Sequence, residues 1–472
     1  MNSSLVRSFS LLAIFLLVGC AGRRYQPAPI VPTETASKLE SRNLSDAGLQ
    51  AFVEKNLGQP TTASPPNSWD LRTLWLAAQY FNPALEAARA RVAESEAAVV
   101  SAGARPNPTL GIAPGIPSPY LLTLDFSVPI ETAGKRGHRI ESARNLDQAA
   151  EFDLAETVWK LRSGVRAALV DCLVGSRDLD LLHSDEQIRS EQVSLLEQRF
   201  AVGEIPRPDL DLARIQLSQA HLAASNAEGQ AGQSRAALAA AIGISVGALE
   251  GAEFSWPSLE SPPSAESLSP KALQADAVLN RLDVRRSLAQ YAAAEADLQL
   301  EISKQYPDVQ IGPGYSYEER DSFFTLGIST ILPLFNRNQG PIAEAEARRK
   351  AAAAAFLEKQ AQVIAESERA LAGYTAALNE FAEADTSLRN LQNEQEQMMR
   401  RAVAVGEEDR LTLNGVRIES SVAARARLDA VRRAWSALGS LEDAVQRPLG
   451  PGDPTWQTEF TSPDALVKEQ RQ

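Results

Sequence analysis

The sequence predicts a mainly helical fold with a membrane β-barrel contribution, built from a duplicated helix–strand–strand–long helix–helix repeat. Three observations support this prediction: a very long helical pattern, two short alternating segments before it, and a second copy of both about 200 residues later. The 472 residues carry a formal charge of −13 and only 6% aromatic residues. An acidic chain without a basic stripe is a poor nucleic-acid binder, so we expect no nucleic-acid partner.

The long helical pattern runs from Ile140 to Phe200 without a proline, and apolar residues recur three or four positions apart. Helical spacing sustained over so many turns is rare in a compact domain. At about 1.5 Å per residue, a helix of roughly 65 residues extends about 100 Å. No single globular core is that long. Its partners must be other long helices, which predicts a coiled-coil-like barrel or bundle.

Two segments before this helix, 109–116 and 122–128, alternate apolar residues with small or polar ones. Their length and period are those of transmembrane β-strands, although a soluble hairpin beneath a helix has the same pattern. One face of each strand is expected to meet lipid, through Leu124 in the first repeat and Leu326 in the second. The other face is expected to line a wet lumen, through Thr123, Asp125, Ser127, Gln310, Ser316 and Ser329.

The second half of the chain repeats the first at a nearly constant offset. A helix predicted over 69–104, kinked at Asn82-Pro83, has its counterpart over 271–304. Alternating segments return over 309–317 and 324–332, and a further long helix is expected from Gly340. A constant offset across a whole half is a specific sign of internal duplication.

Composition and repeat boundaries together divide the chain. We expect a lipoprotein signal peptide over 1–19, an N-terminal tether over 20–68, a first repeat over 69–250, a Pro/Ser-rich linker over 251–270, a second repeat over 271–447 and a flexible tail over 448–472.

The N-terminal segment ends in Leu17-Val18-Gly19-Cys20, which resembles a bacterial lipobox. The apolar run before it is too short to span a bilayer as a stable helix. The resemblance implies cleavage before Cys20 and acylation of that cysteine, while Ala21 implies sorting to the outer membrane. An ordinary signal peptide with an accidental cysteine is the alternative. The second cysteine, Cys172, lies on an apolar helix face and is expected to be a buried structural residue.

Four membrane strands cannot close a barrel, for which about eight is the practical minimum. An open sheet edge is not tolerated in lipid, so several chains must contribute to one barrel. The long helices leave the same end of that barrel and must also assemble around its axis. The expected product is a tube, which serves as a conduit rather than a catalyst.

The order of elements over most of 69–446 resembles the TolC-like outer-membrane efflux proteins. Three segments resemble the CzcC-like branch in particular: Asn82-Pro83-Ala84-Leu85, Arg105-Pro106-Asn107-Pro108, and Pro129-Ile130-Glu131-Thr132-Ala133-Gly134-Lys135-Arg136-Gly137. The resemblance implies a homotrimer with a twelve-stranded barrel in the outer membrane. It also implies a periplasmic adaptor, an inner-membrane pump of the resistance–nodulation–division type, and export of divalent cations such as cobalt, zinc and cadmium. The alternatives are a multidrug or organic-solute channel of the same fold, and a periplasmic coiled-coil scaffold or adaptor lipoprotein without a pore.

Two matching turns are the candidate functional site, because the resemblance assigns them to adaptor docking and to the closed gate. Their residues are Val202, Gly203, Glu204, Arg207, Asp209 and Asp211 in the first repeat, and Val405, Gly406, Glu407, Glu408, Asp409 and Arg410 in the second. Rings of carboxylates in an oligomer would attract cations, with Arg207 and Arg410 as the nearest groups to offset their repulsion. Acidic residues are also common at helix N-termini and solvated turns.

Motifs for catalysis or cofactor binding are missing from the sequence. The three histidines, His138, His183 and His221, form no HExxH pair, and Gly134-Lys135 lacks the rest of a phosphate-binding loop. No Ser/His/Asp spacing suggests a nucleophile. We therefore expect no enzyme activity, no cofactor and no resident metal site.

Overall fold

The computed structural model describes residues 24–57, 68–115, 121–266, 268–318 and 321–449. The chain divides into two units, the first ending at Arg42 and the second beginning at Asn43. The first unit contains helix α2 (Pro32–Glu40), which buries none of its side chains. All other described elements belong to the second unit, and the predicted signal peptide and Cys20 lie outside the described residues.

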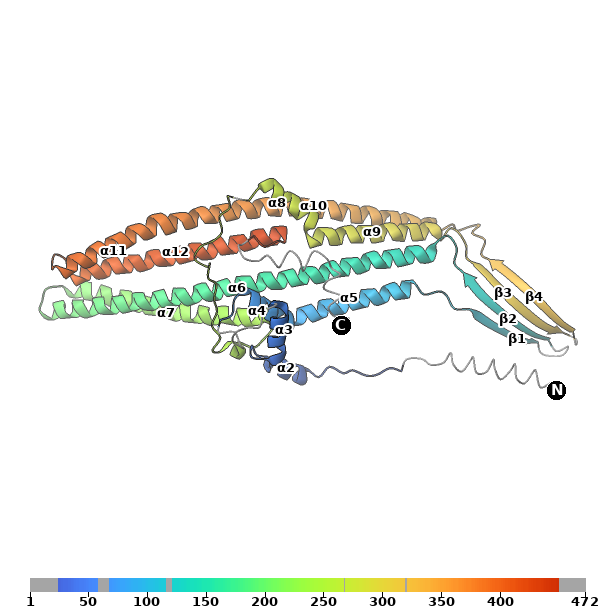
Figure 1. Cartoon of the computed structure of the whole chain (residues 1–472), viewed down its shortest axis with the longest axis horizontal. Coiled ribbons are helices and arrows are strands. Elements are labelled where there is room, and N and C mark those ends of the chain that lie inside the picture. Colours follow the sequence, from blue (N-terminus) through green and yellow to red (C-terminus); the bar gives the residue numbers. More distant parts are fainter. Residues whose placement is uncertain (1–23, 58–67, 116–120, 267, 319–320, 450–472) are drawn as a thin grey trace. The chain divides into compact units, whose positions relative to one another are not determined.

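The second unit contains the two repeats in the predicted order (Figure 1). After α3 (Ala47–Leu57), the first repeat comprises α4 (Leu71–Phe81), α5 (Pro83–Ala102), β1 (Thr109–Gly115), β2 (Leu121–Ile130), α6 (Lys135–Ala201) and α7 (Arg207–Ile242), followed by the short 3₁₀ helix η1 (Val246–Leu249). The second comprises α8 (Pro270–Asn280), α9 (Leu282–Ser303), β3 (Val309–Glu318), β4 (Asp321–Thr330), α10 (Gln339–Ala382), the π-helical η2 (Glu383–Leu388), α11 (Arg389–Ala404) and α12 (Arg410–Val445). The predicted fold class is confirmed.

The break between α4 and α5 is sharper than the predicted kink. Asn82 adopts an extended backbone (φ −72°, ψ 120°), its side chain caps α5 by accepting from the Ala84 amide, and Pro83 occupies the first turn of α5. The side-chain amide of Asn82 also donates, through Nδ2, to the Ala241 carbonyl at 2.9 Å. Proline is tolerated at the first turn of a helix because that amide has no intrahelical acceptor, so this sequence ends one helix and starts another.

One predicted helix is broken, and a second, the long helix expected from Gly340, forms as predicted but contains a π-helical segment. The helix expected over 271–304 breaks at Arg281, whose extended backbone (ψ 133°) leaves its side chain buried against Asp283, Glu366 and the Ala444 carbonyl. The second long helix contains the π-helical segment η2, where the Thr386 hydroxyl donates to the Ala382 carbonyl four residues earlier. Such side-chain bonds compete with the helical ladder and bend helices.

The four strands form one antiparallel sheet in the order β1-β2-β3-β4, so the two hairpins join through β2 and β3. The register pairs Thr123 with Ser316 and Asp125 with Gly314 across this junction. Directly opposed residues share a face, so every residue predicted for the wet side lies on one face. Leu124 and Leu326 lie on the other, with Leu110, Ile112, Phe126, Ile311, Tyr315, Phe324 and Ile328. The predicted division of faces is confirmed, with Leu121 and Phe323 as large apolar exceptions on the polar face.

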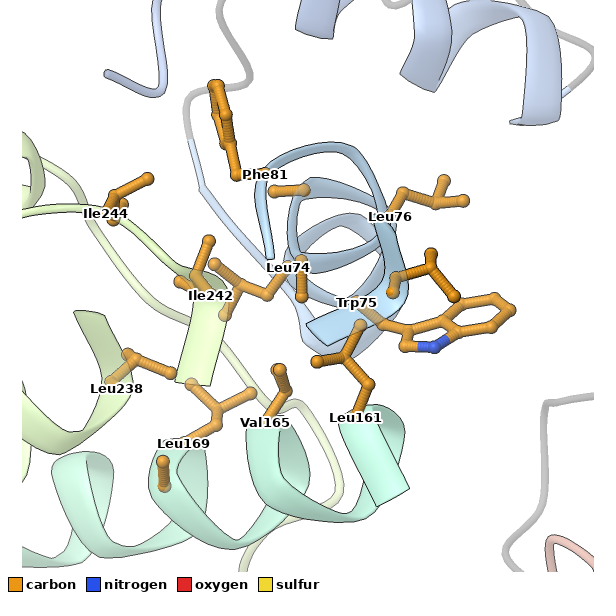
Figure 2. Packing of buried hydrophobic residues seen from close by; sticks show 14 of the residues in the cluster. Leu74, Trp75, Leu76, Phe81, Leu161, Val165, Leu169, Leu238, Ile242 and Ile244 are labelled. Atoms are coloured by element: carbon orange, nitrogen blue, oxygen red, sulfur yellow. The ribbon is translucent and has the colours of Figure 1, made fainter. Parts of the chain in front are cut away.

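Helix α6 contains 67 residues and organises both repeats. Figure 2 shows one core, to which α4 contributes Leu74, α7 contributes Leu238 and α6 contributes Val165; all three are fully buried. A second core contains Val170 and Val174 of α6 with side chains of α8, α10 and α12. Because consecutive turns of α6 enter both cores, this helix holds the second repeat against the first.

Candidate functional site

The first candidate turn joins α6 to α7. Gly203 has a left-handed backbone (φ +78°), and the Glu204 amide donates to the Arg199 carbonyl at 2.9 Å, which closes the end of α6. Glycine adopts this conformation without the steric penalty of a Cβ atom. Val202 and Glu204 are exposed in the turn itself. Arg207 begins α7, with Asp209 in its first turn and Asp211 just beyond.

The second turn joins α11 to α12 and repeats this geometry. Gly406 has φ +81°, and the Glu407 amide donates to the Ala402 carbonyl at 2.9 Å. Val405 is 71% exposed, the same value as Val202 in the first turn. Glu408 precedes Asp409, the N-cap of α12, whose side chain makes no capping hydrogen bond, and Arg410 begins the helix.

The two turns of one chain are joined by an ion pair that the sequence did not reveal. The Arg199 guanidinium, in the last turn of α6, contacts the Asp409 carboxylate. Arg207 lies within 3.4 Å of Asp211 on its own helix, and Arg214 lies 2.7 Å from Glu197 across the α6–α7 hairpin. Arg207 therefore pairs with Asp211, one of the acids whose charge we expected it to balance. The charge of Asp409 is balanced by Arg199 rather than by Arg410.

Arg199–Asp409 is the last of a series of charged contacts along the seam between α6 and α12. Arg417 lies 3.5 Å from Glu191, and Arg425 lies 2.7 Å from Asp178. These exposed pairs are individually worth about 0–1 kcal/mol. Their value is in fixing the register of two antiparallel helices from different repeats. Sequence alone shows charges on both helices, but not which of them face one another.

The series begins in a buried cluster around Glu442 of α12. Its Oε2 accepts from Arg162 at 3.0 Å and also from Arg166, and its Oε1 accepts from the Leu449 amide at 2.9 Å. All three charged side chains are almost fully buried. Burial opposes ionisation of this carboxyl, yet the two guanidinium groups hold the pKa of Glu442 below its ordinary value.

Gly439 makes room for this cluster. A Cβ atom at that position would lie 2.5 Å from Arg166 Nη2, closer than any normal contact. The Arg166 side chain thus passes over the backbone of α12 at a point where only glycine leaves space. We expect Gly439→Ala to displace Arg166 and lower the thermal midpoint of unfolding, whereas Gly373→Ala in α10, where a Cβ meets nothing within 4 Å, should not lower it.

The Gly134-Lys135-Arg136 segment is a structural joint between the sheet and the helices. Lys135 is buried and donates to the Tyr306 carbonyl and to Asp308, each at 2.6 Å. Arg136 donates to the Gly103 carbonyl at 2.7 Å. These contacts tie the start of α6 to the entry of β3 and to the end of α5. The segment that carried the family resemblance therefore anchors the strands of one repeat to those of the other.

None of the described helices is long and apolar enough to cross a membrane. In the same part of the chain, no group of three or more histidine, cysteine, aspartate or glutamate side chains is placed to hold a metal ion. Cys172 is buried, as expected, and burial raises the pKa of its thiol. A half-open cavity of about 710 Å³ lies between α6, α10 and α12, but its lining charges, such as Arg281 and Glu366, largely pair with one another.

A fold with a two-faced sheet at one end of long paired helices and two acidic turns at the other is shared with known outer-membrane channel proteins. Residues 77–244 match the family described as outer membrane efflux protein. The cobalt-zinc-cadmium resistance protein CzcC of Cupriavidus metallidurans is 28% identical over 285 residues, which cover 60% of this chain and 66% of CzcC. The pyoverdine export outer membrane protein OpmQ of Pseudomonas aeruginosa is 26% identical, covering 71% of this chain and 74% of OpmQ.

Solved structures share the fold. The CmeC outer membrane channel of Campylobacter jejuni superposes with a TM-score of 0.67 at 14% identity, over 95% of this chain and 97% of CmeC. Residues 77–244 thus resemble outer membrane efflux proteins, and the predicted resemblance to CzcC is confirmed. The family and these structures are channel proteins rather than enzymes, in agreement with the sequence.

Proposed function

We propose that the chain is the outer-membrane channel of a tripartite efflux system, in which a homotrimer passively conducts substrate supplied by a periplasmic adaptor and an inner-membrane pump. The observation that carries this proposal is the sheet. Its outer strands β1 and β4 each pair on one side only among the described residues, and none of the described helices packs over either face (Figure 1).

A sheet of this kind requires partner chains. Leu326, Ile328 and Phe324 of β4 are each more than two-thirds exposed. Such an apolar face is stable in contact with lipid. The unpaired backbone N–H and C=O groups of β1 and β4 are not, because lipid offers them no hydrogen-bond partner. Three copies of this four-stranded sheet give twelve strands, enough to close a barrel and remove every edge. The polar face, with Thr123 and Asp125, then lines the lumen.

The helices also expose apolar residues at positions suited to partner helices. Leu391 and Met398 of α11 and Val405 in the turn that follows it are spaced seven residues apart, and each is more than 60% exposed. Leu212 and Ile215 of α7 are likewise more than half exposed. A seven-residue apolar interval is the spacing of a coiled-coil seam. A pore-free scaffold also uses such seams, but it has no use for lipid-length strands.

The substrate we propose is a divalent cation such as cobalt, zinc or cadmium. Support comes from the likeness to CzcC, whose name specifies those metals, and from the segments of this chain that resemble its branch. OpmQ is named for pyoverdine export, so an organic solute is the second candidate. Cells that lose this chain should lose tolerance to zinc, cobalt or cadmium and regain it on complementation. Loss of tolerance to organic compounds alone would favour the second candidate.

We assign the two turns to adaptor docking and to the gate. Exposed Val202 and Val405 offer apolar contacts at matching positions, and the neighbouring acids would form rings in a trimer. Neutralising Asp209, Asp211, Glu408 and Asp409 together should abolish the cation preference of single channels in planar bilayers at low salt.

The control for this prediction is ionic strength. The charge effect should fade near 1 M salt, where the screening length is about 3 Å. Replacing Arg207 and Arg410 should raise conductance, and Arg199→Gln should raise it further, because it frees the two turns of one chain from each other. Unchanged selectivity of the quadruple variant at low salt would identify the acids as solvated turn residues.

We also propose that Cys20 carries a lipid anchor. Cys20→Ser should abolish labelling with radioactive palmitate while the protein still assembles, because a closed barrel holds the membrane without the acyl chains. Cys172→Ser is the matched control, because this cysteine is buried in α6 and its replacement should leave labelling intact. Palmitate labelling that persists in Cys20→Ser would contradict the assignment.

A further inference from the structure

Two of the three histidines meet two glutamates across the α6–α7 hairpin. His183 and Glu186 belong to α6, and His221 and Glu228 belong to α7. His183 Nε2 lies 3.6 Å from Glu228 Oε1, and its other ring nitrogen, Nδ1, lies 3.8 Å from Glu186 Oε2. Glu186 Oε1 is hydrogen-bonded to His221 Nδ1 at 2.9 Å. The four side chains are 29–71% exposed, so aqueous ions can reach them.

The His183 ring faces a carboxylate on each side, Glu186 at Nδ1 and Glu228 at Nε2. A neutral imidazole carries one proton, so one ring nitrogen presents a lone pair. If the proton stays on Nδ1, toward Glu186, the Nε2 lone pair faces the negatively charged oxygen of Glu228. This arrangement is repulsive unless a second positive species lies between the two atoms. A proton can supply that charge, and so can a metal cation.

We propose that His183 Nε2 and Glu228 Oε1 bind one divalent cation of the zinc or copper class, with water completing its coordination. Imidazole nitrogen and carboxylate oxygen bind zinc at about 2.0–2.2 Å, so two ligands of a tetrahedral ion lie roughly 3.4 Å apart. The observed 3.6 Å needs almost no adjustment. Imidazole suits zinc and copper, whereas sites made of oxygen alone suit magnesium and calcium.

Glu186 and His221 support this cation without binding it, because they hold the side of the His183 ring that faces away from it. Metal-binding histidines usually donate their other N–H to a carboxylate, which fixes the tautomer and raises ligand basicity. Glu186 lies on that side of His183, and His221 holds Glu186 in place. With two protein ligands, the site is consistent with the absence of a three-ligand group in the described residues.

The cation would join α6 to α7 within the periplasmic hairpin, 18 residues before the end of α6, which is about 27 Å along the helix. This inference goes beyond the proposed channel function. It assigns a bound cation to the hairpin whatever solute the channel conducts, and it predicts that zinc stiffens the hairpin that presents the first turn.

The test is zinc binding by the purified full-length protein in detergent, measured by equilibrium dialysis at neutral pH. The wild type should bind one zinc ion per chain at this site. His183→Ala and Glu228→Gln should each weaken that binding by about tenfold or more. Glu186→Gln should weaken it by about tenfold, because the carboxylate that orients the His183 ring is lost. His138→Ala is the matched control, since this histidine lies at the start of α6, and it should bind as the wild type does.

Acidification should release the zinc from the wild type, because protons compete for the same nitrogen. Circular dichroism should show the same helix content in all variants, and single-channel conductance should be unchanged in His183→Ala. The proposal is overturned if His183→Ala and Glu228→Gln bind zinc as tightly as the wild type, or if His138→Ala loses the same site. Neither result would alter the case for the channel, which rests on the sheet.

Discussion

Replacing Glu442 by alanine is expected to lower the free energy of unfolding by about 3–5 kcal/mol, because it removes the buried carboxylate that both guanidinium groups contact. Asp443, which lies 3.5 Å from Arg166, is about half exposed and is a poorer substitute. Arg162 and Arg166 are each about 95% buried, so water cannot replace the carboxylate. The Leu449 amide also loses its acceptor. The midpoint of thermal unfolding, followed by circular dichroism in detergent, should fall by several degrees or more.

An exposed pair provides the control for this prediction. Glu380 of α10 contacts Arg433 of α12 at 2.7 Å, with both side chains about half exposed. Glu380→Ala should change stability by less than about 1 kcal/mol. Equal effects at Glu442 and Glu380 would show that the buried cluster does not hold α6 to α12.

The same carboxyl should also make stability depend on pH. The pKa of Glu442 is lower in the folded chain than its ordinary value of about 4.3. The contribution of Glu442 to the free energy of unfolding is therefore fully present above the ordinary pKa and is lost as the pH falls through the folded pKa. As the pH is lowered from about 5, the free energy of unfolding of the wild type should fall faster than that of Glu442→Gln, whose side chain binds no proton at this position. Parallel curves for the two proteins would contradict the assigned ion pairs.

The second large effect is expected on the sheet. Arginine at Leu326 or Leu124 should destabilise the membrane-inserted assembly by about 2–4 kcal/mol per chain if these side chains face lipid near the bilayer midplane. Arginine at Thr325 or Thr123, the residues immediately before these leucines, should be tolerated because that face of the sheet is expected to meet water. The register places each pair on opposite faces of one sheet.

The measurement is the fraction of protein recovered as assembled oligomer from outer membranes, relative to total protein in the cell. The threonine variants serve as controls for the charge itself, since they add the same side chain one position away. Equal loss of oligomer in both sets would mean that the two faces meet the same medium, and the membrane assignment of the sheet would fail.

Much of this fold was predictable because its signals are local. The alternation of Leu122, Leu124 and Phe126 with Thr123 and Asp125 defined a strand and its faces before any pairing was known. Long apolar periodicity defined α6, and the Val-Gly pairs marked both turns. These features depend on backbone conformation and on the medium that a side chain meets, and residues close together in the sequence determine both.

The missed features all depend on residues far apart in the chain. The break at Arg281 follows no proline and is stabilised by Glu366 and the Ala444 carbonyl, which belong to other helices. The contact of Arg199 with Asp409 joins residues 210 positions apart. The pairing of β2 with β3 was likewise not predicted, because a hairpin pattern does not say which of its edges meets the next hairpin.

The central claim is that copies of this chain complete one another's sheet in groups of three. Native mass spectrometry of the protein, extracted from outer membranes in detergent, tests that claim most directly. The account predicts a single assembly with the mass of three mature chains, which supplies twelve strands and leaves no open edge. A stable monomer or dimer as the membrane-extracted species would contradict it.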